Sequence, residues 1–265
     1  DNAGDVNGDG FDDVVGGAPN YASGKADVDF GTGAGVSGAK RLTADGYTTS
    51  KLGASVAGAG DVNGDGYADV LAGDWAYASS RGWAGVWQGA SSLAGIWRQS
   101  SSLVGASAGA YMGWSLDGAG DVNRDGYDDV IVSAPGFGAS AGQVYIYHGT
   151  VTGLASSPDR TISGSAAGQQ LGDQVAGVGD VNGDGYDDVA IATQYQSSST
   201  GRVWIFHGSS SGAPGVAATT LSGAAAGDAF GAAVEPAGDV NGDGYDDVLI
   251  GAPSAAAGAG QAFLY

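Results

Sequence analysis

The sequence contains no cysteine, only two histidines and few basic residues. Without cysteine it can form neither a disulfide nor a thiolate metal site, so a secreted domain of this kind needs another cross-link. Lysine and arginine number 9 against 29 aspartates and glutamates, which gives a formal net charge of −20. Such a charge repels nucleic acid and anionic membrane surfaces and attracts cations. From this charge we expect no nucleic-acid partner. No apolar run approaches the roughly 20 residues that cross a bilayer, so we also expect no membrane insertion.

Glycine is abundant, with 52 of the 265 residues, and short alanine, serine and glycine runs resemble low-complexity sequence. Hydrophobic residues nevertheless make up 43% of the chain, and 12 tyrosines and 6 tryptophans are present. A chain of this length and composition can bury a sizeable core. We therefore expect a folded protein.

One acidic loop occurs five times. It spans residues 5–13, 61–69, 121–129, 180–188 and 239–247. Consecutive loops begin 56 to 60 residues apart, with 61 − 5 = 56 and 121 − 61 = 60 as the extremes. A nearly constant period of this length indicates a repeat architecture.

Each repeat predicts four short strands and no helix. An apolar stretch with a glycine precedes the loop at residues 52–56, 112–116, 171–175 and 230–234. The loop is followed by apolar strands at 130–132, 189–191 and 248–250, by alternating aromatic strands at 144–147, 203–206 and 262–265, and by weaker strands near 160–162 and 219–221. Four antiparallel strands per repeat are typical of a β-propeller blade. We predict an all-β propeller in a single domain, residues 1–265, rather than separate β-sandwiches, which need no even spacing.

The two ends of the chain predict incomplete blades. The first repeat begins at its acidic loop, and the last one stops at Tyr265 after a third strand. Three, four, four, four and three strands give an expected total of 18, which is not a multiple of four. The chain is then either a five-bladed ring with two ragged ends or part of a longer propeller, and we favour the second.

The acidic loop has the pattern D-x-N-x-D-G-x-x-D, or a close variant, in every repeat. Oxygens at positions one, three, five and nine, with the carbonyl of position seven, can converge on a hard cation, and the glycine permits the tight turn. So many oxygens suit Ca²⁺ better than the smaller octahedron of Mg²⁺. An EF-hand needs a carboxylate at position twelve, where this chain has Gly16, Ala72, Val132, Ile191 and Ile250. The pattern therefore predicts a calcium site between two strands.

The predicted calcium ligands are the same five positions in every loop. The side chains are those of Asp5, Asn7, Asp9, Asp13, Asp61, Asn63, Asp65, Asp69, Asp121, Asn123, Asp125, Asp129, Asp180, Asn182, Asp184, Asp188, Asp239, Asn241, Asp243 and Asp247. The carbonyls are those of Phe11, Tyr67, Tyr127, Tyr186 and Tyr245. We expect about five ions, mainly structural, which replace the missing disulfides by holding each first hairpin closed.

The repeats resemble the FG-GAP repeats of integrin α-subunit propellers and of their bacterial and fungal relatives. Phe230-Gly231 and Gly251-Ala252-Pro253 carry the motif in full, and Gly17-Ala18-Pro19 carries half of it. The resemblance covers the whole chain and implies extracellular, calcium-binding propellers, usually of seven blades. Residues 73–75 and 192–194 depart from Gly-Ala-Pro, and Arg124 replaces a loop glycine, which we expect to tilt the third loop without removing a ligand.

Ligands of such propellers usually dock on the face opposite the calcium loops. On that face the second repeat carries an unusual set of residues, Asp74, Trp75, Tyr77, Arg81 and Trp83. They could stack on a sugar ring or anchor a protein partner, whereas the alternative is that Trp75 and Trp83 pack between blades. Tyr21, Phe137 and Tyr195 lie in comparable loops, and Asp27 and Asp29 replace third-strand tyrosines as expected edge residues.

We expect an extracellular recognition or adhesion module that binds a glycan or protein ligand, secreted or on the cell surface, and not an enzyme. The alternatives are a domain of a secreted polysaccharide lyase or hydrolase and a purely structural scaffold. Against catalysis, His148 and His207 occupy matching repeat positions, and no Ser-His-Asp order or nucleophile elbow stands out. A carboxylate pair outside the loops, such as Asp228 with Glu235, stays open as an acid and base.

Overall fold

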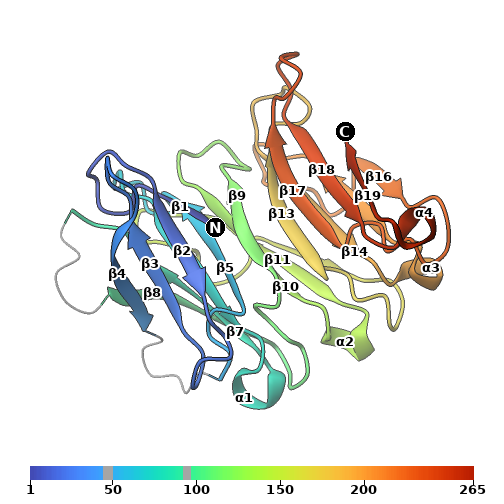
Figure 1. Cartoon of the computed structure of the whole chain (residues 1–265), viewed down its shortest axis with the longest axis horizontal. Helices are drawn as coiled ribbons and strands as arrows, with labels where there is room; N and C mark the ends of the chain where they lie inside the picture. Colours follow the sequence, from blue (N-terminus) through green and yellow to red (C-terminus); the bar gives the residue numbers. More distant parts are fainter. Residues whose placement is uncertain (44–49, 92–96) are drawn as a thin grey trace.

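The computed structural model describes residues 1–43, 50–91 and 97–265, and these residues form five β-sheet blades arranged as a β-propeller (Figure 1). The first blade contains β1 (Asn2–Gly4), β2 (Asp13–Gly17), β3 (Ala26–Phe30) and β4 (Ser37–Thr43). The second contains β5 (Ser55–Gly60), β6 (Asp69–Asp74), β7 (Trp83–Trp87) and β8 (Trp97–Val104). The third contains β9 (Leu116–Gly120), β10 (Asp129–Ala134), β11 (Gln143–Tyr147) and β12 (Arg160–Ser163).

The fourth and fifth blades follow the same plan. The fourth contains β13 (Gln174–Gly179), β14 (Asp188–Thr193), β15 (Arg202–Phe206) and β16 (Thr219–Ser222), and the fifth contains β17 (Ala233–Gly238), β18 (Asp247–Ala252) and β19 (Gln261–Leu264). Neighbouring strands within a blade are antiparallel, and a short parallel pairing of β4 with β8 joins the first two blades into one sheet. The innermost strands β1, β5, β9, β13 and β17 contact one another in turn, so the blades fan around a common centre (Figure 1).

The inner strands are built from small residues because they approach one another closely. A side chain at Gly58, Gly118 or Gly177 would collide with the backbone of the preceding inner strand. The second strands of the three middle blades, β6, β10 and β14, are buried on both faces. The prediction of apolar second strands is confirmed, and the core lies in layers between successive blades.

Two details of the strand prediction are wrong. The first blade does have an inner strand, because Asn2 pairs with Val14 in β2, so the described residues contain 19 strands and not 18. The other inner strands begin three or four residues later than predicted and run to the acidic loop. The glycine of the FG dipeptide interrupts the extended backbone: Gly113, for example, has φ +76°, far from the strand region, and the regular pairing begins after it.

Four single helical turns, where none was predicted, connect the second and third strands. They are α1 (Tyr77–Ser80), α2 (Phe137–Ser140), α3 (Gln196–Ser199) and α4 (Ala255–Gly258). Each contains residues with φ and ψ near +55° and +50°, such as Ser197 at 54° and 52°. Their middle residues are alanine, serine and glycine, and of these only glycine enters the left-handed region without a steric cost. The turns lie at the ends of the blades opposite the acidic loops (Figure 1).

Candidate metal centres and ligand surfaces

The five acidic loops share one backbone conformation. The glycine at position six has φ between +86° and +90° in all five loops, a left-handed value that suits glycine. Position four is also left-handed, and Arg124 adopts it with φ +58°. The third loop keeps the hydrogen bonds of the second, so Arg124 leaves the internal conformation of the loop unchanged. Arg124 places its guanidinium over the ring of Tyr186, 5.5 Å from the ring centroid.

The side chains at positions one and three turn back onto their own loop. In the second loop the Asp61 carboxylate accepts the N–H groups of Asp65 and Gly66 at 3.1 and 2.8 Å. The Asn63 carbonyl oxygen accepts the same Asp65 N–H at 2.8 Å. The other four loops repeat these bonds. In the described ranges no three acidic or histidine side chains already form a coordination shell, but the oxygen-only donor set fits a hard divalent cation.

Position nine is a buried carboxylate in every loop. Asp129 is fully buried, and its two oxygens accept the N–H groups of Val122 at 3.1 Å and Gly149 at 2.9 Å. These bonds connect the loop to the end of the third strand. Burial raises the pKa of Asp129 to about 8, and the charges of Asp125 and Asp121 add to the rise. Sequence reasoning treated this position only as a ligand, and the structure adds a role in positioning the loop.

The pKa of the position-nine carboxylate is also raised in the neighbouring loops. Burial, again the main cause, raises the pKa of Asp69 to about 7 and that of Asp188 to about 6, and His207 opposes the rise at Asp188. Each buried carboxylate lies near other acids of its loop, and no ion pair of a loop carboxylate with lysine or arginine is recorded in the described residues. A bound cation would relieve this concentration of negative charge.

Position eight is a functional position that the sequence analysis missed. The carboxylate of Asp128 accepts the backbone N–H of Asp61, the first residue of the preceding loop, at 2.7 Å. Asp187 and Asp246 make the same contact with Asp121 and Asp180 at 2.8 and 3.0 Å. The Asp-Asp doublet at positions eight and nine was the available signal, and Ala68 interrupts it in the second loop.

The structure separates the five residues predicted to bind a ligand. Trp83 is fully buried against Trp87, and the fully buried carboxylate of Asp74 accepts the N–H groups of Ser50 and Lys51 at 2.7 and 3.0 Å. These two side chains therefore stabilise the fold, and neither is exposed to a ligand. Two others are also committed to the fold. Tyr77 packs partly buried against the core, and the Arg81 guanidinium donates to the Gly105 carbonyl.

Trp75 instead belongs to an aromatic cluster on the face opposite the acidic loops. Its ring centroid lies 5.8 Å from that of Tyr111 and 5.7 Å from that of Trp114. Trp114 is 39% exposed, and its side chain hydrogen-bonds the buried carboxylate of Asp173. A groove beside the cluster is lined by Pro19, Asn20, Lys51, Ala54, Trp75 and Trp114. Tyr111 and Trp114 precede an inner strand of the next blade, so only the fold brings them to Trp75.

The other aromatic residues predicted for this face differ in exposure. Tyr21 is 63% exposed and carries the Lys25 ammonium 5.7 Å from its ring centroid. Tyr195 is 43% exposed, whereas Phe137 packs against the core. Tyr21 and Tyr195 are thus exposed aromatic side chains, and Phe137 is not.

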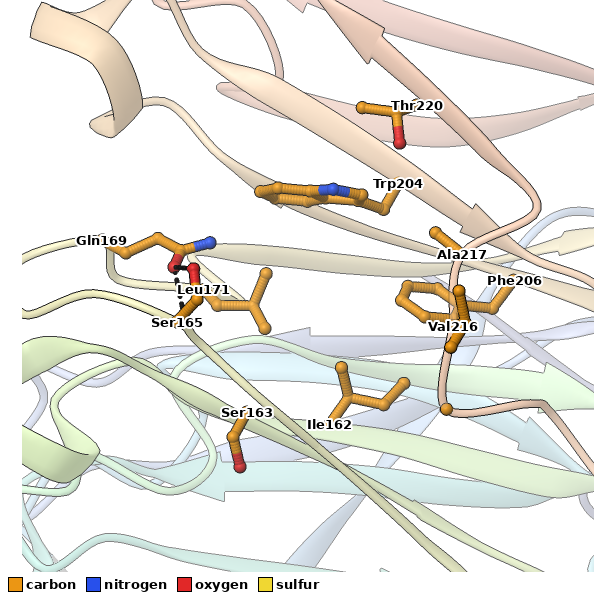
Figure 2. Close-up of a pocket in the computed structure, with 11 residues that line it drawn as sticks. Ile162, Ser163, Ser165, Gln169, Leu171, Trp204, Phe206, Val216, Ala217 and Thr220 are labelled. Carbon is orange, nitrogen blue, oxygen red and sulfur yellow. Dashed lines mark hydrogen bonds between the residues drawn. The ribbon is translucent and has the colours of Figure 1, made fainter.

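A second candidate ligand surface is a cleft between the third and fourth blades. Figure 2 shows the Trp204 ring between Thr220 on one side and Gln169 with Leu171 on the other. Gln169 is only 7% exposed; its side-chain oxygen accepts the Ser165 N–H at 2.8 Å, and its nitrogen points into the cleft (Figure 2). No charged side chain is among the lining residues. The cleft therefore suits an uncharged molecule with a flat apolar face and a hydrogen-bond acceptor.

The remaining residues singled out in the sequence, His148, Asp27 and Asp228, each contact another residue of the protein. His148 lies 3.5 Å from the Asp159 carboxylate, and Asp27 forms an ion pair with Lys25. Asp228 accepts the N–H of Ala225 at 2.7 Å, and no contact between Asp228 and Glu235 is recorded among the described residues.

Glu235 lies instead in a polar channel at the centre of the propeller. The channel is lined by Asp1, Ser55, Val56, Ser115, Leu116, Asp117, Gln174, Val175 and Glu235. Burial raises the pKa of Asp117 to about 7, and the charge of Glu235 adds to the rise. Asp117 also accepts the N–H of Gly177 in the next blade at 3.1 Å, so it braces two inner strands.

Comparison with known proteins identifies the repeats. The FG-GAP repeat family matches residues 112–147, and the FG-GAP-like repeat family matches residues 180–250. Integrin alpha-4 of Xenopus laevis is 33% identical over 154 residues, 56% of this chain and 15% of that protein. Integrin alpha-8 of Gallus gallus is 31% identical over 174 residues, which cover 61% of this chain and 16% of its own length.

The match with these relatives is confined to one part of each. Integrin alpha-PS5 of Drosophila melanogaster, 33% identical over 164 residues, is likewise covered over only 16% of its length. The chain thus spans about a sixth of the length of these curated relatives. Among the described residues, no helix is long and apolar enough to cross a membrane.

Proposed function

We propose that this chain is a calcium-stabilised recognition module, because two of its segments match the FG-GAP and FG-GAP-like repeat families and its sequence resembles integrin alpha subunits. It works outside the cell and binds a glycan or protein ligand away from its metal loops. The observation that carries the recognition role is the partly exposed cluster of Trp75, Tyr111 and Trp114, in which the Trp114 side chain is exposed. Large aromatic surfaces of this kind supply binding energy to both protein and sugar ligands.

The calcium role is supported by the chemistry of the loops. Every loop offers three aspartates, one asparagine and one carbonyl at the five proposed ligand positions. When a cation is bound it neutralises the repulsion among these carboxylates and favours their ionised forms. The loop hydrogen bonds orient the first and third positions, and the position-nine carboxylate anchors the loop to the third strand. Calcium sites of extracellular modules are often as weak as ~10⁻⁴ to 10⁻³ M, which suits a protein outside the cell.

Calcium titration of the chelated protein tests this role. We expect about five ions to bind by calorimetry and the melting temperature to rise steeply with calcium, because only the folded state offers the sites. Asp125→Asn removes one proposed ligand charge and is expected to weaken one site, whereas Asp29→Asn, on a third strand, leaves calcium binding unchanged. Absence of binding by the wild-type protein, or binding without a rise in melting temperature, contradicts the proposal.

Ligand recognition at the aromatic cluster is tested with a glycan array and with extracellular-matrix proteins as probes. Trp114→Ala is expected to weaken any binding at least about tenfold, the loss of one hot-spot residue. Trp83→Phe, in the core, is the matched aromatic control and should retain binding. If Trp75→Ala and Trp114→Ala both bind like the wild type, the cluster is not the ligand site.

The Trp204 cleft supports a separate, sugar-sized site. Its aromatic wall and the Gln169 amide match a pyranose ring that presents an apolar face and a carbonyl or hydroxyl acceptor. Monosaccharides titrated into the protein should shift the Trp204 fluorescence, and Gln169→Leu should reduce the affinity while keeping the shape of the cleft. An unchanged affinity in Gln169→Leu would remove the amide from the site.

A hydrolase or lyase remains the second candidate function, because Asp117 and Glu235 line one pocket, where burial raises the pKa of both carboxyls and the charge of Glu235 raises that of Asp117 further. Such a pair can serve as general acid and base on a polysaccharide. Incubation with a panel of acidic and neutral polysaccharides, with Asp117→Asn and Glu235→Gln as controls, tests it. Cleavage that both variants retain would exclude this pair.

A further inference from the structure

The carboxylate at position eight of a loop reaches across to the preceding blade. At the junction of the second and third blades, Asp128 accepts the N–H of Asp61 at 2.7 Å, and its own N–H donates to the Asp61 carbonyl at 3.2 Å. The carboxylate lies over Gly60, where an added side chain would collide with it. Two hydrogen bonds thus fix the peptide of Asp61, which is the first proposed calcium ligand of its loop.

The hydrogen bond between the first residue of a loop and the position-eight carboxylate of the next loop is called the tie below. The next two junctions repeat it, and the first junction lacks it. Gly120 and Gly179 have φ of +66° and +70° and are covered by the carboxylates of Asp187 and Asp246. At the first junction Gly4 has the same conformation, φ +67°, but the residue facing it is Ala68. The Ala68 N–H still donates to the Asp5 carbonyl at 3.1 Å. The glycine socket is therefore present, and only the carboxylate that fills it elsewhere is missing.

We propose that Asp128, Asp187 and Asp246 are positioning residues for calcium, each of which orients the first ligand of the preceding loop. Through these ties the second, third and fourth loops bind calcium more tightly than the first loop, and ion binding in each of the three is coupled to the packing of the next blade. The inference rests on the proposed calcium role of the loops.

The physical reason is preorganisation. Without the tie, the N–H of the first ligand is free to turn, and the order needed to hold a cation must be acquired when the ion binds. With the tie, that order already exists in the folded protein. The proposed effect comes from the hydrogen bond, so an asparagine, which keeps an acceptor oxygen, should replace the aspartate.

The test is calorimetric calcium titration of the full, chelated chain below the melting temperature of every variant. Asp128→Ala copies the natural first junction and should weaken one site about tenfold, the loss of one hydrogen bond to a charged group. Ala68→Asp should fill the socket at Gly4 and strengthen one site by a similar factor. Asp128→Asn should bind like the wild type. Asp12→Ala is the matched control, because Asp12 holds the same loop position but its side chain is exposed, and the variant should change no affinity by more than about twofold.

Each outcome separates the tie from the proposed calcium role. If the wild type binds calcium and Asp128→Ala binds it equally, with only a lower melting temperature, the tie is a structural contact and the inference is overturned. If Asp128→Asn weakens the site as much as Asp128→Ala does, the charge acts and the hydrogen bond does not. A wild-type protein that binds no calcium overturns the proposed function itself. Should Asp128→Ala not fold, Ala68→Asp decides, since an unchanged first site then contradicts the tie.

Discussion

Two junctions between blades use equivalent sequence positions but differ in packing. Side chains fill the junction of the second and third blades, whereas the junction of the third and fourth blades contains a cleft. The filled junction buries Met112, Tyr145, Tyr147 and Leu154. The residues 59 positions later, at the open junction, are Leu171, Trp204, Phe206 and Ala213. Where the first has the buried Ala110, the second has Gln169, whose amide faces the cleft. The repeat therefore specifies the frame of each junction, and a few side chains decide whether a cavity forms.

The same two blades also differ at their metal loops. His148, in the third blade, faces Asp159 at 3.5 Å, whereas its repeat equivalent His207 acts on the buried Asp188. Burial raises the pKa of Asp129 in the third blade to about 8 and that of Asp188 to about 6, and the charge of His207 opposes the rise only at Asp188. Residues at one repeat position can thus serve different electrostatic roles.

The largest expected effect concerns pH and calcium. The pKa values of Asp129 and Asp188 lie above the 3.8 of an unperturbed aspartate, so the calcium-free folded state binds more protons than the unfolded state between about pH 4 and pH 8. Its free energy of unfolding must then fall as the pH rises through this window, by about 1.4 kcal/mol per unit of pKa shift. Thermal unfolding of the chelated protein across this range measures the slope.

Two isosteric variants sharpen this comparison of the blades. Asp129→Asn should remove more of the pH dependence than Asp188→Asn, because its pKa shift is larger. Saturating calcium should flatten the slope in the wild type, since the ion favours the ionised carboxylates. A melting temperature of the chelated protein that rises with pH would contradict the burial argument.

The next largest effect is expected at the filled junction. Tyr145→Ala removes a buried aromatic ring and should lower the free energy of unfolding by about 3–5 kcal/mol, measured by urea denaturation in calcium. Tyr145→Phe is the control and should lose only the bond between the hydroxyl and Gln143, about 1 kcal/mol. A loss below about 1 kcal/mol for Tyr145→Ala would mean that this junction is not tightly packed.

Exchanging the residue that distinguishes the junctions should have a smaller effect. Ala110→Gln places an amide in the filled junction and should cost about 1–3 kcal/mol through overpacking. The reverse change, Gln169→Ala, should cost about 1 kcal/mol, since Ser165 loses one acceptor. Both values come from denaturant midpoints at constant m-value. Equal losses of unfolding free energy in the two variants would contradict the idea that this residue distinguishes the filled junction from the open one.

The smallest effect is expected from Trp204→Ala, at the position equivalent to Tyr145. Because the ring is only partly buried beside the cleft, the loss should be about 1–2 kcal/mol, despite the larger side chain. Denaturation in parallel with Tyr145→Ala measures the contrast. A loss as large as that of Tyr145→Ala would show that Trp204 belongs to the core rather than to a ligand cleft.

The strand prediction was most accurate where the local pattern is strong. The alternating stretch at 203–206 became β15, and the apolar stretch at 189–191 lies within β14. It was least accurate around the FG dipeptide, because a positive φ at Gly113 is a backbone property that hydrophobic periodicity does not report. The one-turn segments between second and third strands were missed for the same reason.

The candidate sites divide along similar lines. The metal positions were found from one short pattern, since all their side chains lie within nine residues, and calcium binding there stays a prediction. The aromatic cluster was found only through Trp75, because Tyr111 and Trp114 reach it from the next repeat. For Trp83 the sequence left ligand binding and packing between blades both open, and only the structure shows that it is buried against Trp87.

The sequence alone determined the repeat, its all-β character and the five acidic loops, because strand alternation and loop chemistry are local and recur at a nearly constant period. Only the tertiary structure decided which repeats touch and what their contacts do. The ties from Asp128 to Asp61 and from Trp114 to Asp173 span 67 and 59 residues. Such contacts depend on the curvature that stacks one blade against the next, and this curvature is set by the packing of all the inner strands together.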